Sequence, residues 1–429
     1  MQTDWLIQGG RVLDPVTGED AVRDLAISGG VIVERPAAGA TVVAAAGRLV
    51  VPGLIDLHVH LREPGGEDNE TIETGSRSAA AGGFTTVVAM PNTKPSHDNV
   101  ETVAYVARRG REVGLTRVLP SGALTLGRKG QQPAPLAALR DAGAVAFTDD
   151  GSTVQDDAVM EQVMREAARL GMVLMDHAQD NLIERQGGVM HDGDVSRRHG
   201  LPGIPTWAEE RIIRRDIELA GKTGCALHIQ HVTSAAGAQA IREGRARGVR
   251  VTGELTPHHL ALCDADIDPA DANYKMNPPL RTAEDRAALV EALRDGTLGC
   301  FATDHAPHSA ERKALGFLKG PFGLVGLETA VGLTYTLAVE KGVISLMDWL
   351  RRWTTVPAAI LGRPHAGLAV GAVADVAVLD VATPWRVDPA QLQSKSKNTP
   401  FGGWTLRGRA AGTWLAGRQV WGGPSPAGR

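Results

Sequence analysis

The residues with the clearest capacity for chemistry are histidines and aspartates that end short apolar runs of the sequence. His58 and His60 close one such run, and because side chains alternate along a strand, both imidazoles are expected on one face. Other polar residues end or follow later runs; they are Asn92, Asp149, Asp150, His177, His231, Asp304 and His308. Burying so many polar groups without partners would cost several kcal/mol, and a metal centre removes that cost.

Imidazole nitrogen and carboxylate oxygen are ligands that suit zinc and its neighbours. The candidate ligands are His58, His60, Asp150, His177, His231 and Asp304. Since three protein ligands usually satisfy one catalytic zinc, this set predicts two ions about 3.5–4 Å apart. His228 and His231 are three residues apart, so only one can face the ions, and His231 lies nearer the carboxyl end of its run.

The elements that must position these side chains are repeated βα units. Between about residues 52 and 340, eight short apolar runs alternate with helical patterns; the runs are 54–58, 84–90, 117–124, 144–148, 172–177, 226–231, 250–255 and 300–304. Helical periodicity covers 100–109, 157–170, 207–220, 235–245 and 283–293. Eight units predict an α/β fold, a closed (β/α)₈ TIM barrel, whose active site lies at the carboxyl ends of the strands.

The two chain ends have a different sequence pattern from the βα region. Short β-type runs separated by glycine-rich turns occur at 5–7, 25–27, 31–33, 41–43 and 373–381 and near Trp404 and Trp414. Neither end has enough strands to bury a stable face alone. We therefore expect residues 1–51 and 366–429 to form one small β-sandwich domain, and residues 52–365 to form the barrel.

Composition excludes several classes of protein. The 429 residues carry a net charge of −4, which argues against non-specific binding of nucleic acid. The three cysteines, Cys225, Cys263 and Cys300, are widely spaced and odd in number, so neither a disulfide framework nor a CxxC zinc site is expected. The first residues show no secretory signal pattern, and no apolar run is long enough to span a membrane. A cytoplasmic enzyme without membrane contact is the prediction.

Several longer motifs carry a family resemblance. They are VPGLIDLHVHLREPG (51–65), AMPNT (89–93), FTDDG (147–151), HIQHVTS (228–234), KMNPPLR (275–281), TDHAPH (303–308) and GPFGLVGLET (320–329). Together they closely resemble dihydroorotases, of the bacterial type I branch of the amidohydrolase superfamily. The resemblance implies the zinc-dependent, reversible cyclisation of N-carbamoyl-L-aspartate to L-dihydroorotate in pyrimidine biosynthesis.

The resemblance also implies metal roles. His58, His60 and Asp304 would hold the more buried zinc ion, and His177 and His231 the second. Much of the superfamily bridges the ions with a carboxylated lysine after strand four, but this chain has no lysine from 130 to 221. Asp150 stands there instead, with Asp149 as the alternative because adjacent residues face opposite ways. Two zinc ions per chain are expected, the second less fully held because an aspartate bridge reaches it less well.

Arg62 is the main clue to the substrate. Its guanidinium, two residues after the histidine pair, can bind a carboxylate in bidentate fashion. The resemblance implies that Asn92 and His308 complete this carboxylate site, that Asn277 bonds the pyrimidine ring, and that Asp304 carries the proton during catalysis. Asn277 before two prolines is also typical of a turn. Residues 309–322 could be either a lid or an ordinary connection.

Two rival interpretations remain. One is another cyclic amidohydrolase, such as an allantoinase or dihydropyrimidinase; Arg62 and the missing lysine argue against it. The other is a non-catalytic homologue that scaffolds aspartate transcarbamoylase. The presence of a residue at every expected ligand position argues against it. A complex with aspartate transcarbamoylase is compatible with activity, and a homo-oligomer is expected.

Overall fold

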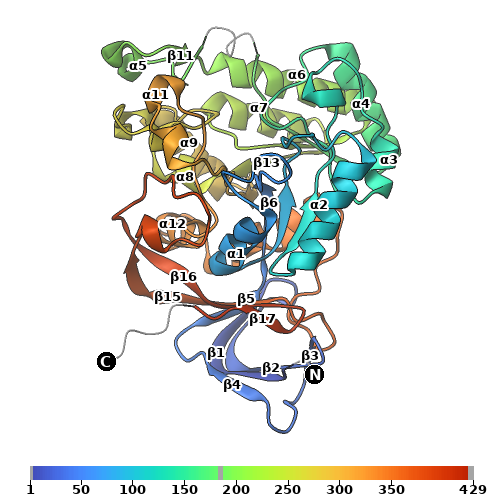
Figure 1. Cartoon of the computed structure of the whole chain (residues 1–429), viewed down its shortest axis with the longest axis vertical. Helices are drawn as coiled ribbons and strands as arrows, with labels where there is room; N and C mark the ends of the chain where they lie inside the picture. Colours follow the sequence, from blue (N-terminus) through green and yellow to red (C-terminus); the bar gives the residue numbers. More distant parts are fainter. Residues whose placement is uncertain (1–2, 182–186, 424–429) are drawn as a thin grey trace.

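The computed structural model describes residues 3–181 and 187–423, and it contains a closed barrel (Figure 1). Its parallel strands are β6 (Leu54–Val59), β7 (Phe84–Ala89), β8 (Arg117–Pro120), β9 (Val173–Asp176), β12 (Ala226–Ile229), β13 (Val251–Leu255) and β14 (Cys300–Phe301). The predicted (β/α)₈ fold is confirmed.

The fourth position of the barrel is filled by the run 144–148, which does not form a regular strand. Phe147 nevertheless bridges Gly122 on one side and Leu174 on the other, both in parallel. Between β14 and β6 the ring closes through a parallel bridge from His305 to Val59, where the His60 amide donates to the His305 carbonyl at 2.8 Å. The eight predicted runs therefore form one continuous wall.

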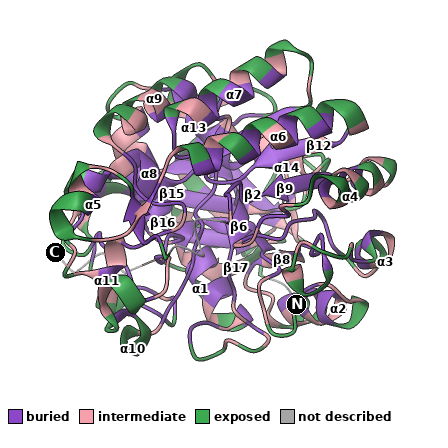
Figure 2. Ribbon diagram, turned by 90° about the horizontal axis from the view of Figure 1, so that it is seen from above, coloured by how far each residue is buried: buried purple, intermediate pink, exposed green. Residues whose placement is uncertain are grey.

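Helices surround this wall, with buried faces toward the strands and exposed faces outward (Figure 2). The helices of the βα layer are α1 (Ile72–Gly82), α2 (Val100–Val113), α3 (Leu136–Asp141), α4 (Asp157–Arg169), α6 (Trp207–Thr223), α7 (Ala235–Ala246), α9 (Ala283–Arg294), α13 (Leu346–Trp353) and α14 (Thr355–Ile360). Side-chain caps explain several starts: Asn99, Asp156, Ser234 and Thr282 each accept a hydrogen bond from the first turn of the next helix. The five helices predicted from periodicity all appear.

Short helices and strands lie at the barrel mouth and in the connections. They are β10 (Met190–His191), α5 (Asp194–His199), β11 (Gly203–Ile204), α8 (Pro257–Ala261), α10 (Ala310–Lys313), α11 (Gly316–Lys319) and α12 (Ala330–Thr334), which continues into a π-helical turn (Tyr335–Val339). Single 3₁₀ turns lie at Leu126–Arg128, Asp264–Asp266, Ala272–Tyr274 and Pro389–Gln391. Among the described residues, no helix is both long and apolar enough to cross a membrane.

The chain ends meet in one eight-stranded sheet below the barrel (Figure 1). Its strands are β1 (Trp5–Asp14), β2 (Glu19–Ser28), β3 (Val31–Val33), β4 (Thr41–Ala44), β5 (Leu49–Pro52), β15 (Val376–Arg386), β16 (Thr405–Leu415) and β17 (Arg418–Trp421). Strand β5 pairs antiparallel with β15, which joins the two ends. The sheet folds over its own core, in which Ile7, Val50 and Trp414 are fully buried.

Between β15 and β16 the chain leaves this sheet and returns to the barrel. Val387 and Phe401 pack in a cluster with Met276 and Leu324, which belong to barrel connections near the mouth. Residues 387–404 thus contact the functional end of the barrel although they lie between two strands of the small sheet. The domain boundaries at residues 51 and 366 stay a prediction.

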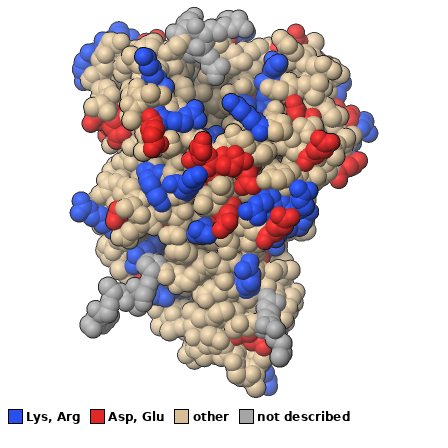
Figure 3. All heavy atoms as spheres, viewed as in Figure 1, with Lys and Arg blue, Asp and Glu red and all other residues tan. Residues whose placement is uncertain are grey.

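Surface charge is mixed. On the face drawn in Figure 3, lysine and arginine side chains are interspersed with aspartate and glutamate. This pattern agrees with the small net charge of −4.

Candidate metal centre and substrate pocket

A cavity of about 280 Å³ lies at the carboxyl ends of the barrel strands. The candidate residues that line it are His60, Arg62, Asn92, Asp150, His177, His231, Asn277, Asp304 and His308. His58 lies just below, fully buried. The structure therefore brings together every site residue predicted from the sequence.

The first possible metal cluster consists of His58, His60 and Asp150. Asp150 Oδ1 lies 3.1 Å from Nε2 of His58, and Oδ2 lies 3.5 Å from Nε2 of His60. Asp304 Oδ1 adds a second carboxylate, 2.9 Å from Nε2 of His60 and 3.5 Å from Nε2 of His58. Both imidazoles thus direct Nε2 toward two carboxylates, as the alternation along β6 predicts.

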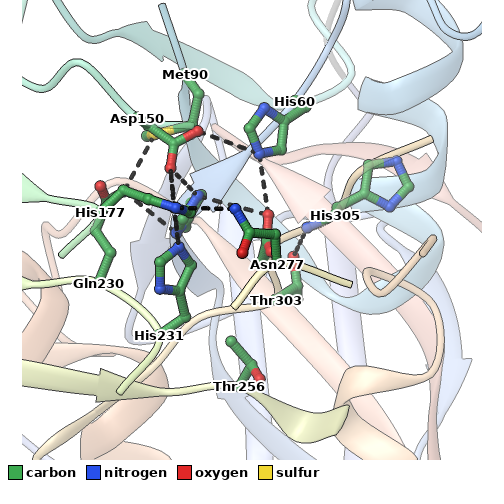
Figure 4. Close-up of polar contacts among 12 residues, drawn as sticks. His60, Met90, Asp150, His177, Gln230, His231, Thr256, Asn277, Thr303 and His305 are labelled. Carbon is green, nitrogen blue, oxygen red and sulfur yellow. Dashed lines mark hydrogen bonds and ion pairs between the residues drawn. The ribbon is translucent and has the colours of Figure 1, made fainter. Parts of the chain in front are cut away.

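The second possible cluster consists of Asp150, His177 and His231 (Figure 4). Nδ1 of His177 lies 2.8 Å from Nε2 of His231 and 3.7 Å from Asp150 Oδ1. Asp150 is common to both clusters, which is the position that a bridging ligand must take. Burial would raise the pKa of this carboxyl, but His58 and His177 hold it well below its usual value, so Asp150 is an anion.

Asp149 points away from both clusters. Its carboxylate accepts hydrogen bonds from the amides of Leu124 and Thr125 at 2.8 and 3.2 Å and from the Thr125 hydroxyl. It therefore fastens the loop after β8, and the geometry favours Asp150 over Asp149 as the bridge. His228 also faces away: it contacts Glu254 at 3.0 Å and the Thr252 hydroxyl at 2.8 Å.

The backbone is strained at three residues of this site. Arg62, His231 and Asp304 have φ values of 61°, 31° and 45°, a region that side chains other than glycine rarely occupy. Such conformations cost about 1–3 kcal/mol each and persist where surrounding contacts enforce them. These conformations lower the stability of the folded chain, and they direct the three side chains into the cavity.

Arg62 and His308 lie side by side in the cavity wall, and Arg62 supplies the positive charge there. Nη2 of Arg62 lies 3.2 Å from Nε2 of His308, and Nε of Arg62 donates to the carbonyl of Pro307 at 3.2 Å. Burial lowers the pKa of Arg62 to about 10, so the guanidinium stays protonated at neutral pH. Burial, together with the Arg62 charge, lowers the pKa of His308 to about 2, so this imidazole is neutral.

The two asparagines contact predicted metal ligands. The Asn92 Oδ1 accepts from Nδ1 of His60 at 2.9 Å, while Nδ2 of Asn277 lies 3.2 Å from Nε2 of His177. Both residues also line the cavity. They can therefore orient a ligand imidazole and face a substrate from the same position.

Sequence reasoning missed Glu254 and Gln230. Glu254 is fully buried on β13 and accepts from Nδ1 of His58 at 2.8 Å, while Nε2 of Gln230 lies 3.2 Å from the same nitrogen. A charged residue in the apolar run 250–255 was the available signal for Glu254. His258 and His259, which follow the run 250–255, are also buried; His259 bonds the Thr256 hydroxyl at 2.6 Å and the Pro278 carbonyl at 3.1 Å.

The connection 309–322 is fastened to its surroundings by two lysines. Lys313 donates to the carbonyls of Ala272 and Pro321 at 2.9 and 3.0 Å, and Lys275 donates to the Gly320 carbonyl at 2.8 Å. Pro321 and Phe322 form part of the cavity wall. The segment thus contributes to the wall of the pocket.

Comparisons with known proteins identify the family that the chain resembles. Residues 47–236 match a family model described as dihydro-orotase-like. The chain is 50% identical over 395 residues to a dihydroorotase from Bacillus caldolyticus, covering 91% of this chain and 92% of that protein. It is 47% identical over 425 residues to a dihydroorotase from Halalkalibacterium halodurans, covering 97% and 98%.

Among solved structures, the fold is similar to an L-hydantoinase (dihydropyrimidinase) from Arthrobacter aurescens. The TM-score is 0.86 at 25% identity, with 100% of this chain and 98% of that chain covered. The barrel and the accessory sheet are therefore shared with amidohydrolases of related chemistry, whereas the high sequence identity is to dihydroorotases. This chain belongs to the dihydroorotase family.

Proposed function

We propose that this chain catalyses the reversible cyclisation of N-carbamoyl-L-aspartate to L-dihydroorotate. The observation that carries the proposal is the position of Arg62, whose guanidinium faces the same cavity of about 280 Å³ as both histidine and aspartate clusters. A cationic, planar donor beside a hydrolytic centre suits a ring that bears a carboxylate. Asn92 and His308 would complete the carboxylate site, and Asn277 would bond the ring.

Two zinc ions per chain would occupy the clusters. His58, His60 and Asp304 would hold one ion, His177 and His231 the other, with Asp150 between them. The donor set fits, because Nε2 of His58 is buried without a hydrogen-bond partner while it faces Asp150 at 3.1 Å. The second ion would be less fully occupied, because an aspartate bridge reaches it less well than a carboxylated lysine.

When bound, the ions would lower the pKa of a water molecule toward neutrality and polarise the ring carbonyl. In the hydrolytic direction, the oxygen of the attacking water bonds to the carbonyl carbon, and Asp304 takes a proton from that water. The carbon–nitrogen bond of the ring then breaks, and Asp304 delivers the proton to the departing nitrogen. The biosynthetic direction is the reverse: nitrogen attacks the carboxyl carbon and water leaves. Arg62 holds the substrate carboxylate throughout, so the ring stays aligned with Asp304.

We further propose a cytoplasmic homo-oligomer that can associate with aspartate transcarbamoylase. The thiols Cys225, Cys263 and Cys300 are free and buried, as suits a reducing compartment. The two assembly proposals rest on the resemblance to type I dihydroorotases. Light scattering of the chain alone, and then mixed with aspartate transcarbamoylase, tests them separately.

The decisive experiment compares three substrates with the zinc-loaded chain, with metal per chain measured on the same sample. We expect hydrolysis of L-dihydroorotate but of neither dihydrouracil nor allantoin. Asp304→Asn should abolish this hydrolysis. Asp149→Asn, which alters a buried aspartate that points away from both clusters, is the control. Preference for a ring without a carboxylate would contradict the proposal and favour a dihydropyrimidinase or allantoinase. Full metal without turnover of any substrate would favour the non-catalytic scaffold.

A further inference from the structure

Asn398 lies outside the barrel in sequence but beside the substrate cavity in space. It belongs to residues 387–404, the excursion between β15 and β16, and only 5% of its surface is exposed. No motif used to identify the site contains it. Its contacts nevertheless run to two segments that line the cavity.

The Asn398 side chain uses its oxygen and both of its N–H groups on those segments. Oδ1 accepts from the backbone amide of His308 at 3.0 Å. Nδ2 donates to the carbonyls of Ala306 and Gly323 at 3.1 and 3.0 Å. One amide group therefore joins the loop after β14 to the segment 321–323, both of which line the cavity.

The backbone of Asn398 strengthens the same connection. Its carbonyl accepts from the Val325 amide at 2.8 Å. The side chain of Asn398 therefore binds residue 323 and its main chain binds residue 325. Gly323 has φ 120°, and a Cβ there would lie 2.5 Å from the Cβ of Ala306. The two segments are thus packed as closely as glycine permits, and Asn398 lies across their junction.

The group at the end of this chain of contacts is His308. Its Nε2 lies 2.8 Å from the carbonyl of Phe322 and 3.2 Å from Nη2 of Arg62. Because Asn398 fixes the His308 amide relative to Gly323, it also fixes the imidazole relative to Phe322 and the guanidinium. A shift of either segment would misplace the His308 imidazole relative to the Arg62 guanidinium.

We propose that Asn398 is a positioning residue that sets the carboxylate specificity of the pocket by acting through His308. The inference rests on the proposed function, because it presumes that Arg62 and His308 bind the substrate carboxylate. Asn398 itself touches neither the reacting atoms nor the metal ligands in the contacts described above. Its loss should therefore weaken substrate binding more than the chemical step.

The test is a double-mutant cycle measured with L-dihydroorotate on the zinc-loaded chain. Asn398→Ala should raise KM about tenfold with kcat changed less than about threefold, since misplacement of binding groups by about 1 Å has effects of this order or larger. His308→Ala should raise KM by a similar factor. The double variant should be less than about twofold worse than His308→Ala alone, because both changes remove one interaction.

Two further variants keep the result interpretable. Asn398→Ser retains an oxygen and should show a smaller rise in KM. Gln391→Ala alters an exposed side chain in the same excursion, which donates to Asp388 at 3.0 Å, and it should match the wild type. Metal per chain and thermal denaturation establish that each variant is folded and loaded.

Several outcomes would overturn the inference. They are unchanged KM in folded Asn398 variants, a loss confined to kcat, fully additive effects in the cycle, or failure of both Asn398 variants to fold, which would make the residue a determinant of the fold. If the wild type does not turn over L-dihydroorotate, the proposed function itself fails. The two failures are therefore distinguishable.

Discussion

Glu254 accepts a hydrogen bond from Nδ1 of His58 at 2.8 Å, and this contact leaves Nε2 of His58 to face Asp150. The same carboxylate accepts from the backbone amide of His231 at 3.0 Å. One buried side chain therefore orients a residue of each metal cluster. Carboxylates in this position fix the tautomer of a ligand histidine and increase its basicity.

Substitution of Glu254 tests that relationship. Glu254→Gln should lower zinc affinity about 10–100-fold, because it weakens the acceptor for His58. Competition with a chelator, read as metal per chain, measures the change. The control is Glu328→Gln, which alters a partly buried carboxylate bonded to Ser78 and to the Gln393 and Ser394 amides instead. Equal metal affinity in the Glu254 variant and the wild type would contradict the role.

The adjacent residues Asp150 and Asp149 should respond oppositely to the same substitution. Asp150→Asn removes the anion shared by both clusters, so it should abolish activity and reduce bound metal to one ion per chain or fewer. Asp149→Asn should retain metal but lower the free energy of unfolding by about 1–3 kcal/mol, because buried hydrogen bonds to Leu124 and Thr125 are weakened. Metal analysis and denaturant titration separate these results, and metal loss confined to Asp149→Asn would reverse the assignment.

Arg62→Met should impair carboxylate recognition without removing metal. The guanidinium contacts His308 and Pro307 and none of the histidines of the two clusters in the described hydrogen bonds. KM for L-dihydroorotate should rise about 10²-fold, equivalent to about 3 kcal/mol, the order expected when a buried charged partner is lost. Arg312→Met is a matched control on the neighbouring α10. An unchanged KM for Arg62→Met would move the carboxylate site elsewhere in the cavity.

The sequence predicted the site well because strand alternation and barrel topology act locally and repeatedly. His58 and His60 share a face since they are two residues apart at the carboxyl end of β6, His60 directly after it, and Asp304 and His231 follow strands whose carboxyl ends converge. The five helices predicted from periodicity required only amphipathic spacing and capping residues. These features depend on neighbours within a few positions.

Other features depend on contacts that no local pattern contains. The choice between Asp150 and Asp149 required the partners of Asp149 in the loop after β8. Glu254 contacts His58 across 196 positions, and Asn398 contacts His308 across 90. The run 144–148 resembles a full strand in sequence, but among the described residues its two β-bridges both lie at Phe147, and Val145, Ala146 and Thr148 add single backbone hydrogen bonds. Long-range packing decides all of these, so they became evident only in three dimensions.

His97 should make the stability of the fold depend on pH. It is fully buried, its Nδ1 donates to the Ser121 carbonyl at 2.9 Å, and burial lowers its pKa to about 4 from an ordinary 6.5. Between these values the unfolded chain binds a proton that the folded chain does not, so stability falls as pH falls from about 6.5 to about 4. The loss attributable to this histidine is on the order of 2–3 kcal/mol across that window.

The comparison of the wild type with His97→Asn isolates this contribution. Asparagine can still donate to the Ser121 carbonyl but does not titrate, so the variant should be less stable at pH 7.5, where packing is lost, yet should lose less stability between pH 7.5 and 5. Denaturant unfolding with chelator present throughout removes the pH dependence of metal binding from both proteins. Since the other buried histidines remain in both, only the difference between the two slopes reports on His97. Parallel loss of stability in the two proteins would show that this imidazole accepts a proton in the folded state as readily as in the unfolded chain.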